Sequence, residues 1–152
     1  MTIDYVAGMS IFLLAVAFVF QFMYGLFAPF QSGSDDVTLA ADRASTILVE
    51  RLLVADNIRA ANVIDERKLS DFFSELKNNE TDALNDTGLF ATKTAAFDLN
   101  VSVVNLTSNK LIIQGGRSLP ENTDIGQTRR AVLIVNSTNG NQTYAILSVR
   151  VW

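Results

Sequence analysis

The distribution of apolar residues separates a first segment without charges from a longer region of mixed pattern. Residues 6–30 form 25 consecutive positions that contain no Asp, Glu, Lys or Arg. A helix of that length extends about 37 Å, which exceeds the roughly 30 Å hydrocarbon core of a bilayer. Because its apolar residues lie on every side, such a helix must be surrounded by lipid or by other protein. We therefore predict a hydrophobic helix over residues 1–30.

A short polar break separates this helix from a second one. Gln31-Ser32-Gly33-Ser34 is small and polar and follows Pro29, which predicts a hinge over 31–34. Asp35 and Asp36 then supply the acids of a first helical turn. Helical spacing continues through Val37, Ala40, Ala41, Ala44, Ile47, Leu48, Leu52 and Ala55. Val49, Leu53 and Val54 widen this apolar surface beyond one stripe, so part of it is available to neighbouring subunits.

The remaining sequence predicts a third helix and then strands. Leu69, Phe72, Phe73 and Leu76 have helical spacing within residues 66–76. The polar stretch 78–88 is rich in turn formers and predicts a loop. Alternating or β-branched residues then predict four strands, over 97–103, 110–114, 130–135 and 143–151. Asn139-Gly140 suits a hairpin turn between the last two strands, and Gly115-Gly116 predicts the turn that ends the second.

These elements together predict an α+β fold. A long N-terminal hydrophobic helix over 1–30 precedes the hinge at 31–34 and an α+β head over 35–152. Short links between successive strands predict an antiparallel β-meander, with the second helix covering one of its faces.

The amino-acid composition disfavours a catalytic function. Hydrophobic residues are 49% of the chain and charged residues 18%, and there is no Cys and no His. The commonest general base, thiolate nucleophiles and Cys or His metal ligands are therefore excluded. The formal net charge of −4 disfavours a nucleic-acid partner. We predict no enzyme activity, no catalytic residues, no metal and no cofactor.

Three charged pairs have simpler interpretations than a binding site. Asp35-Asp36 and Asp65-Glu66 each precede or begin a predicted helix, so they are predicted to act as helix caps. Arg129-Arg130 has no neighbouring basic or aromatic residues and is predicted to be a solvated entry to a strand.

The sequence MTIDYVAGMS places one acid, Asp4, at the start of the hydrophobic helix. The helix dipole favours a carboxylate there by about 0.3–1 kcal/mol, so capping alone accounts for it. A carboxylate within a membrane is expensive unless it is paired, and the α-amino group of Met1 from a neighbouring subunit would pair with it. Ala7, Gly8 and Ser10, with Ala15 and Ala17, offer small surfaces for close helix approach, which favours self-association.

A near-terminal acid followed by 25 apolar residues resembles the N-terminal helix of type IV pilins and of pilin-like archaeal filament proteins. The ending Val149-Arg150-Val151-Trp152 is similar to that of short archaeal pilin-like proteins. This resemblance implies an extracellular filament that is a helical homopolymer. It also implies storage in the cytoplasmic membrane, a prepilin peptidase and pilus assembly machinery as partners, and adhesion as a function. The absence of Cys favours an archaeal source over a bacterial one.

Six N-x-[ST] motifs occur in the predicted head and none before it, at Asn79, Asn85, Asn100, Asn105, Asn136 and Asn141. They predict N-linked glycans and hence a head outside the cytoplasm. Asn100 shares a strand face with Asp98 and Ser102 and is expected to point outward, whereas Asn105 shares the inward parity of Val103. The other four motifs fall in predicted loops.

Several alternatives remain for the hydrophobic segment. A cleavable signal peptide is disfavoured because no basic residue precedes Arg43 and the apolar run is too long. The centre of a soluble domain is disfavoured by the lack of a polar face. A single-span anchor of a monomeric extracellular binding domain, or a minor pilin or pseudopilin, stays open. Replacement of Asp4 distinguishes a filament subunit from a plain anchor.

Overall fold

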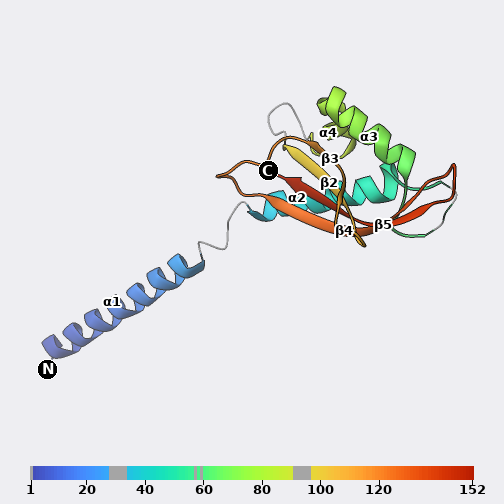
Figure 1. Cartoon of the computed structure of the whole chain (residues 1–152). Helices are drawn as coiled ribbons and strands as arrows, with labels where there is room; N and C mark the ends of the chain where they lie inside the picture. The colour runs from blue at the N-terminus through green and yellow to red at the C-terminus, as the bar shows by residue number, and fades with distance from the viewer. Residues whose placement is uncertain (1, 28–33, 57, 59, 91–96) are drawn as a thin grey trace. The chain divides into compact units, whose positions relative to one another are not determined.

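The structure is a computed structural model of the chain, and it describes residues 2–27, 34–56, 58, 60–90 and 97–152 (Figure 1). Met1 and most of the predicted hinge, residues 31–33, lie outside the described residues. The chain divides into two compact units, Met1–Gly33 and Ser34–Trp152. Helices and a mixed five-stranded sheet together confirm an α+β fold.

The first unit contains one helix, α1, which spans Thr2–Phe27. Most of its residues are Ala, Leu, Ile, Phe, Val and Met, and its single acid, Asp4, lies in the first turn, where the helix dipole favours a negative charge. Its last turn contains no basic residue. The predicted hydrophobic helix is therefore confirmed within the described residues.

The second unit begins with α2 (Ser34–Ile47), which continues into a π-helical turn, η2 (Leu48–Leu52). The Leu53 N–H donates to the Leu48 carbonyl at 2.8 Å, five residues back. A π turn inserts one residue and rotates the side chains that follow. As a result Leu48, Val49 and Leu53 are all buried in the head, whereas Val54 is half-buried. Two of the three residues that widen the apolar surface, Val49 and Leu53, are therefore used within the subunit.

Two further helices follow, α3 (Glu66–Asn78) and α4 (Glu80–Asp86). The α3 helix was predicted, and it buries Leu69, Phe72, Phe73 and Leu76. The prediction of a loop over 78–88 is wrong, because α4 lies inside it. The sequence of α4 is polar since only Ala83 and Leu84 are buried against the core.

The sheet contains β1 (Val63–Asp65), β2 (Leu99–Asn105), β3 (Leu111–Gly116), β4 (Gly126–Val135) and β5 (Gln142–Val151). Its order is β1-β4-β5-β2-β3 (Figure 1), with β1 parallel to β4 and the other pairs antiparallel. The predicted meander is therefore wrong: β2–β3 and β4–β5 are hairpins, but β5 pairs with β2 and β3 becomes an edge. This order places β2 and β5, the two strands with the most buried residues, side by side in the interior of the sheet.

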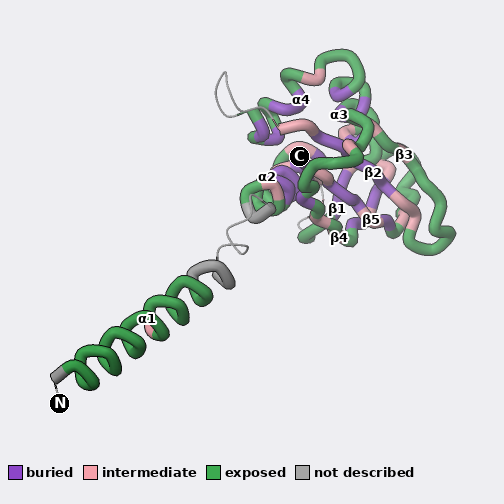
Figure 2. The backbone as a smooth tube through the Cα atoms, turned by 90° about the vertical axis from the view of Figure 1, so that its left-hand side faces the viewer, coloured by how far each residue is buried: buried purple, intermediate pink, exposed green. Residues whose placement is uncertain are grey.

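The core lies between the helices and one face of this sheet, where buried positions are concentrated in Figure 2. Three alanines of α2, Ala40, Ala41 and Ala44, are buried there and allow the helix to lie close to β4. At the start of β4, Gly126 lies against the Val37 carbonyl so closely that a Cβ atom would overlap it. An added Cβ atom at Gly115 would also lie too close to a neighbour, at 2.7 Å from Cδ1 of Phe73. Gly115 and Gly116 are thus part of β3, and the predicted turn there is wrong.

Asp65 provides a test of how α3 is anchored. Its carboxylate accepts a hydrogen bond from the Arg67 N–H at 2.8 Å and another from the Ser137 hydroxyl, which confirms the predicted capping role. The Ser137 hydrogen bond is the largest cause that lowers the pKa of Asp65 below its ordinary value. Because the pKa of Asp65 is lower in the folded than in the unfolded state, its ionised carboxylate stabilises the head at pH values above the unfolded-state pKa. This stabilisation is lost as the pH falls through the unfolded-state pKa and then the folded-state pKa.

We therefore expect Asp65→Ala to lower the free energy of unfolding at pH 7 by about 1 kcal/mol, the usual value of a lost cap. Asp65→Asn keeps a capping oxygen but cannot titrate, so its stability should fall less than that of the wild type between pH 6 and about pH 3. Urea unfolding followed by Trp152 fluorescence measures both effects, with the exposed α3 acid Asp71→Asn as control. An Asp65→Asn profile that follows the wild type would contradict the assignment.

Candidate functional site

The most unusual surface of this protein is that of α1. Residues Ile3–Met23 form a 21-residue stretch with a mean hydropathy of 2.2, and none of it is buried within the chain. Every side chain in that stretch is exposed except Val16, which is half-buried (Figure 2). By length and composition such a helix is compatible with insertion in a membrane or with a signal sequence. An apolar surface this large is not stable in water and requires another environment.

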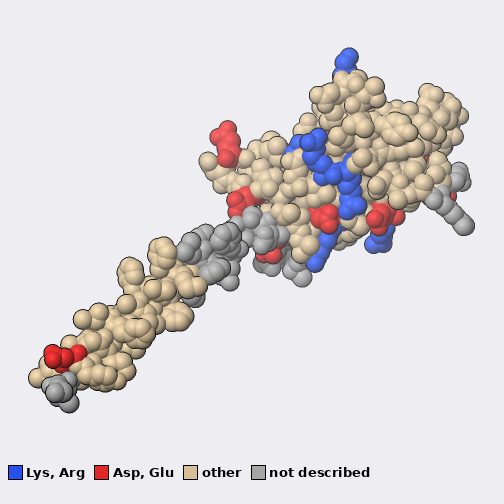
Figure 3. All heavy atoms as spheres, turned by 90° about the horizontal axis from the view of Figure 1, so that it is seen from below, with Lys and Arg blue, Asp and Glu red and all other residues tan. Residues whose placement is uncertain are grey.

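Four of the five predicted assembly residues, Asp4, Ala7, Gly8 and Ser10, lie in the first three turns of α1, and the fifth, Met1, lies outside the described residues. Asp4 and Gly8 are four residues apart and share one side of the helix, with Ala7 beside them. A Cβ on Gly8 would meet no atom within 4 Å, so this surface is open. The Ser10 hydroxyl donates to the Val6 carbonyl at 2.8 Å and is therefore satisfied within the helix. Asp4 is exposed and is the one charged residue of α1 (Figure 3).

The head presents a mixed surface. On the face seen in Figure 3, a short row of basic side chains is bordered by acidic ones. An ion-pair cluster of the head joins α4 to the residue after β3, where the Arg117 Nε donates to Glu80 at 3.0 Å and Nη1 lies 2.9 Å from Asp98. The hydrogen bond to Glu80, together with the charge of Asp98, raises the pKa of Arg117. Within the described ranges no group of three or more His, Cys, Asp or Glu side chains is placed to hold a metal ion.

A shallow groove of about 550 Å³ lies between α3 and the edge strand β3. Phe73 and Leu76 contribute apolar walls, and Lys77, Glu80 and Arg117 contribute charges at its margin. Arg117 and Glu80 form an ion pair at this margin, which links α4 to the residue that follows β3.

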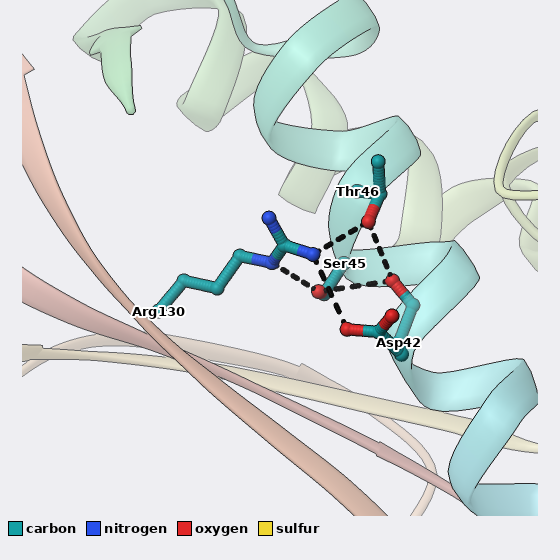
Figure 4. Close-up of polar contacts among 4 residues, drawn as sticks. All are labelled: Asp42, Ser45, Thr46 and Arg130. Atoms are coloured by element: carbon teal, nitrogen blue, oxygen red, sulfur yellow. Dashed lines mark hydrogen bonds and ion pairs between the residues drawn. The ribbon is translucent and has the colours of Figure 1, made fainter. Parts of the chain in front are cut away.

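Sequence reasoning missed a polar cluster that fixes α2 to the sheet (Figure 4). Arg130 of β4 donates through Nε to the Ser45 hydroxyl at 2.7 Å and through Nη2 to the Asp42 carboxylate at 3.2 Å. A further hydrogen bond from Nη2 reaches the Thr46 hydroxyl. The prediction that Arg129-Arg130 is fully solvated is therefore wrong for Arg130. Its parity with the buried Val132 and Ile134 was the signal that its side chain turns toward the helix.

The glycosylation motifs differ strongly in their surroundings. Asn100 is only 3% exposed, and its Nδ2 donates to the Arg117 carbonyl at 2.8 Å. The prediction that it points into solvent is wrong, because β2 is a central strand and the long side chain of Arg150 reaches across to Asn100 and Ser102. Asn105 ends β2 and is half-buried.

The remaining four motifs lie at helix ends or in one turn. Asn85 is in α4 and Asn79 precedes that helix, so the loop predicted for these two is replaced by helical structure. Asn136 and Asn141 lie in the β4–β5 turn, as predicted, and the Asn136 N–H donates to the Asn141 carbonyl at 2.9 Å. Gly140 in this turn has φ +73°, which confirms the need for a residue that tolerates positive φ.

Comparison with known proteins places the chain in a family without assigning it an activity. The sequence model of a family of unknown function (DUF7287) matches residues 1–152, so the chain belongs to that family over its whole length. No curated protein matches the chain, and no solved structure does.

Proposed function

We propose that this member of the DUF7287 family is the structural subunit of an extracellular filament of the type IV pilus class. In this proposal the subunit polymerises through α1, and the head lies on the outside, where it carries glycans and contacts surfaces. The observation that carries the proposal is the nature of α1: a 21-residue apolar stretch with no buried part and a single acid at its tip.

In this proposal α1 is surrounded by lipid before assembly and by other copies of α1 in the filament. Burying most of an apolar helix of this length is worth tens of kcal/mol relative to water, at about 25 cal/mol per Å². The gain from lipid to a bundle of identical helices is much smaller, because lipid tails are as apolar as the side chains. Extraction from the cytoplasmic membrane therefore requires an assembly machine, whereas the packed bundle keeps the helix out of water.

Asp4 gives this bundle a specific register. A carboxylate at the tip of an apolar helix is exposed in the isolated chain, and in a bundle it would be desolvated. The free α-amino group of an adjacent subunit after leader removal would neutralise it, and Ala7 and Gly8 would allow the backbones to approach closely. Contacts of this kind are heterologous, so they propagate as an open helical fibre and do not close into a ring.

The same exposed helix also supports an alternative, a single-span anchor for a monomeric extracellular binding domain. An anchor needs only apolar length, and the acid at position 4 adds no more to it than the modest capping of a first turn, so the two functions differ in their dependence on Asp4. A minor pilin or pseudopilin differs from a major subunit in abundance, which the amount of the chain in sheared filaments measures.

The test uses cells that produce the full chain together with their own assembly machinery. Asp4→Ala is expected to remove at least about 90% of the chain from the sheared surface fraction, a tenfold change that corresponds to about 1.4 kcal/mol, while the membrane fraction keeps it. Asp4→Glu retains the charge and should restore filaments. Asp36→Ala, an exposed acid at the start of α2, is the matched control and should assemble normally.

Electron microscopy of the sheared fraction, with mass spectrometry of the same material, gives the readout. Threads composed of this chain in the wild type and in Asp4→Glu, but not in Asp4→Ala, support the filament. A chain that is displayed at the surface in equal amounts in all variants, with no threads, would establish the anchored monomer instead.

A further inference from the structure

The six glycosylation motifs are divided between the two ends of the head. α2 begins at one end, where Val37 lies against Gly126 at the start of β4. Because β4 has 10 residues, its other end is about 30 Å away at roughly 3.3 Å per residue. The β4–β5 turn lies at that far end, and β2 ends near it, since Asn105 is the register partner of Ala145, three positions after the start of β5. Asn136 and Asn141 are therefore at the end of the head opposite the start of α2, and Asn105 is near that end; Figure 1 shows the β4–β5 turn there.

An asparagine can accept a glycan in a folded protein only if three conditions hold. The side-chain Nδ2 must be free, the residue must be reachable, and the Ser or Thr two positions later must also be reachable, because all three belong to the recognised motif. These conditions can be tested on each motif from the described contacts.

Asn105 meets all three conditions. Its Oδ1 accepts hydrogen bonds from the Thr107 and Ser108 N–H groups, both at 2.9 Å, so the turn after β2 uses the side-chain oxygen and not the amide nitrogen. No described residue accepts a hydrogen bond from its Nδ2. Leu106 and Thr107 are both exposed. The half-buried position of Asn105 thus presents a free amide nitrogen in a fixed geometry.

Asn141 also meets them. Its side chain is exposed and makes no hydrogen bond to the part of the chain that the structure describes, while its backbone is held by the β4–β5 turn. Gln142 is exposed, and Thr143 is half-buried and opens on a shallow hollow of about 200 Å³.

The other four motifs each fail one condition. Asn100 and its partner Ser102 are 3% and 5% exposed. Thr87 of the Asn85 motif is fully buried and donates its hydroxyl to the Ala83 carbonyl at 2.9 Å. Two amides are already in use: the Nδ2 of Asn79 donates to Asp82, and that of Asn136 donates to Glu66. Asn136 further uses its Oδ1 to accept from the Thr138 and Asn139 N–H groups.

We propose that Asn105 and Asn141 are the two N-glycan acceptors of the folded head, and that Asn79, Asn85, Asn100 and Asn136 stay unmodified. This inference rests on the head lying outside the cytoplasm, as in the proposed function. The donor is an oligosaccharide joined through its first sugar carbon to a polyprenyl phosphate or diphosphate. Transfer breaks the bond from that carbon to the phosphate oxygen, which leaves with the electron pair. Nδ2 forms the new bond to the carbon and releases one proton to a base of the transferase.

A glycan on Asn105 would affect an exposed apolar surface near the end of β2. Leu106 and Tyr144 are 54% and 62% exposed, and the Leu106 N–H donates to the Tyr144 carbonyl at 2.9 Å, so the two lie side by side. Together with Leu133 they line a shallow apolar groove of about 270 Å³. A glycan on Asn105 starts at the residue before Leu106 and would shield this surface from water and from nonspecific contacts.

The experiment maps glycans on the full chain by glycopeptide mass spectrometry, in cells whose other exported proteins carry N-glycans. The wild type is expected to carry glycans on Asn105 and Asn141 only. Thr107→Ala keeps the turn of Asn105 but destroys its motif and should remove one glycan mass, and Asn141→Gln should remove the other. Thr138→Ala destroys the Asn136 motif in the same way and, as the matched control, should change nothing.

Each result is decisive for the inference. A glycan on Asn79, Asn85, Asn100 or Asn136 of the folded chain would overturn it, as would a chain that carries none while other exported proteins in the cell are modified. Threads without glycans would overturn this inference and leave the filament standing. Glycans on Asn105 and Asn141 of a chain that forms no threads would support this inference and overturn the filament.

Discussion

Gly126→Ala is expected to lower the free energy of unfolding of the head by about 3 kcal/mol, the upper part of the usual range for overpacking. The added Cβ would overlap the Val37 carbonyl oxygen and carbon, and it would lie 2.5 Å from the Thr38 nitrogen. All three atoms are backbone, so no side chain can rotate away. Either α2 must lift from β4 or the strand must bend, and both separate the buried Ala40 and Ala41 from the sheet.

The measurement is urea unfolding of the full chain in detergent, followed by the fluorescence of Trp152. Trp152 directly follows Val151, the register partner of Gly126, and its N–H donates to the Asp98 carbonyl at 3.3 Å, so it reports on this part of the head. The control is Gln127→Ala, since Gln127 is exposed and adjacent, and it should change stability by less than about 0.5 kcal/mol. A midpoint for Gly126→Ala equal to that of the control would show that α2 approaches β4 less closely than described.

The elements of this fold were largely predictable because their periodicity is local. α1, α3 and the four longer strands follow from the spacing of apolar residues within single segments. The three-residue β1 was missed because Val63–Asp65 is too short for any alternation to be visible. α4 was missed because a helix that buries only Ala83 and Leu84 has the composition of a loop.

The strand order was not predictable in the same way, because it depends on which strands exclude water best when paired. Short connections favour a meander, but β2 and β5 contribute more buried residues than the other strands, and pairing them keeps these residues in the interior of the sheet. This order leaves β3 as an edge, where Leu111 and Ile112 are exposed. The spacing of apolar residues within one segment carries no information about which strands pair with each other.

The candidate sites show the same limit at the level of single side chains. Parity along β2 correctly separates Asn100 from the core residues Leu99 and Val101, but parity does not show that Arg150 of the adjacent strand covers it. Local sequence does not reveal the contacts of Arg130, because its partners on α2 lie more than 80 positions away in the chain. Parity likewise predicts Asn100 outward and Asn105 inward, and only tertiary contacts show which of the six motifs have an accessible amide.

Leu14→Arg is the substitution expected to affect localisation most strongly. Leu14 is 70% exposed and lies near the middle of Ile3–Met23. A leucine at the centre of a spanning helix favours insertion by about 0.5 kcal/mol, whereas an arginine disfavours it by about 2.5–3.5 kcal/mol. The combined change of about 3–4 kcal/mol corresponds to a shift of more than a hundredfold in the partition between membrane and water.

We expect the Leu14→Arg chain to be extracted from membranes by alkaline carbonate and to be absent from surface threads, while the wild type resists extraction. Leu14→Ile keeps an apolar side chain and should behave as the wild type. Leu39→Arg is the control for the added charge, because Leu39 is 49% exposed on α2 in the head and is remote in sequence from the spanning stretch. If Leu14→Arg stayed in the membrane and assembled like Leu39→Arg, then α1 would not be surrounded by lipid or by other copies of itself. Both the anchored monomer and the filament require one of those environments, so this result for Leu14→Arg would contradict both functions. Asp4→Ala, by contrast, distinguishes the two functions from each other.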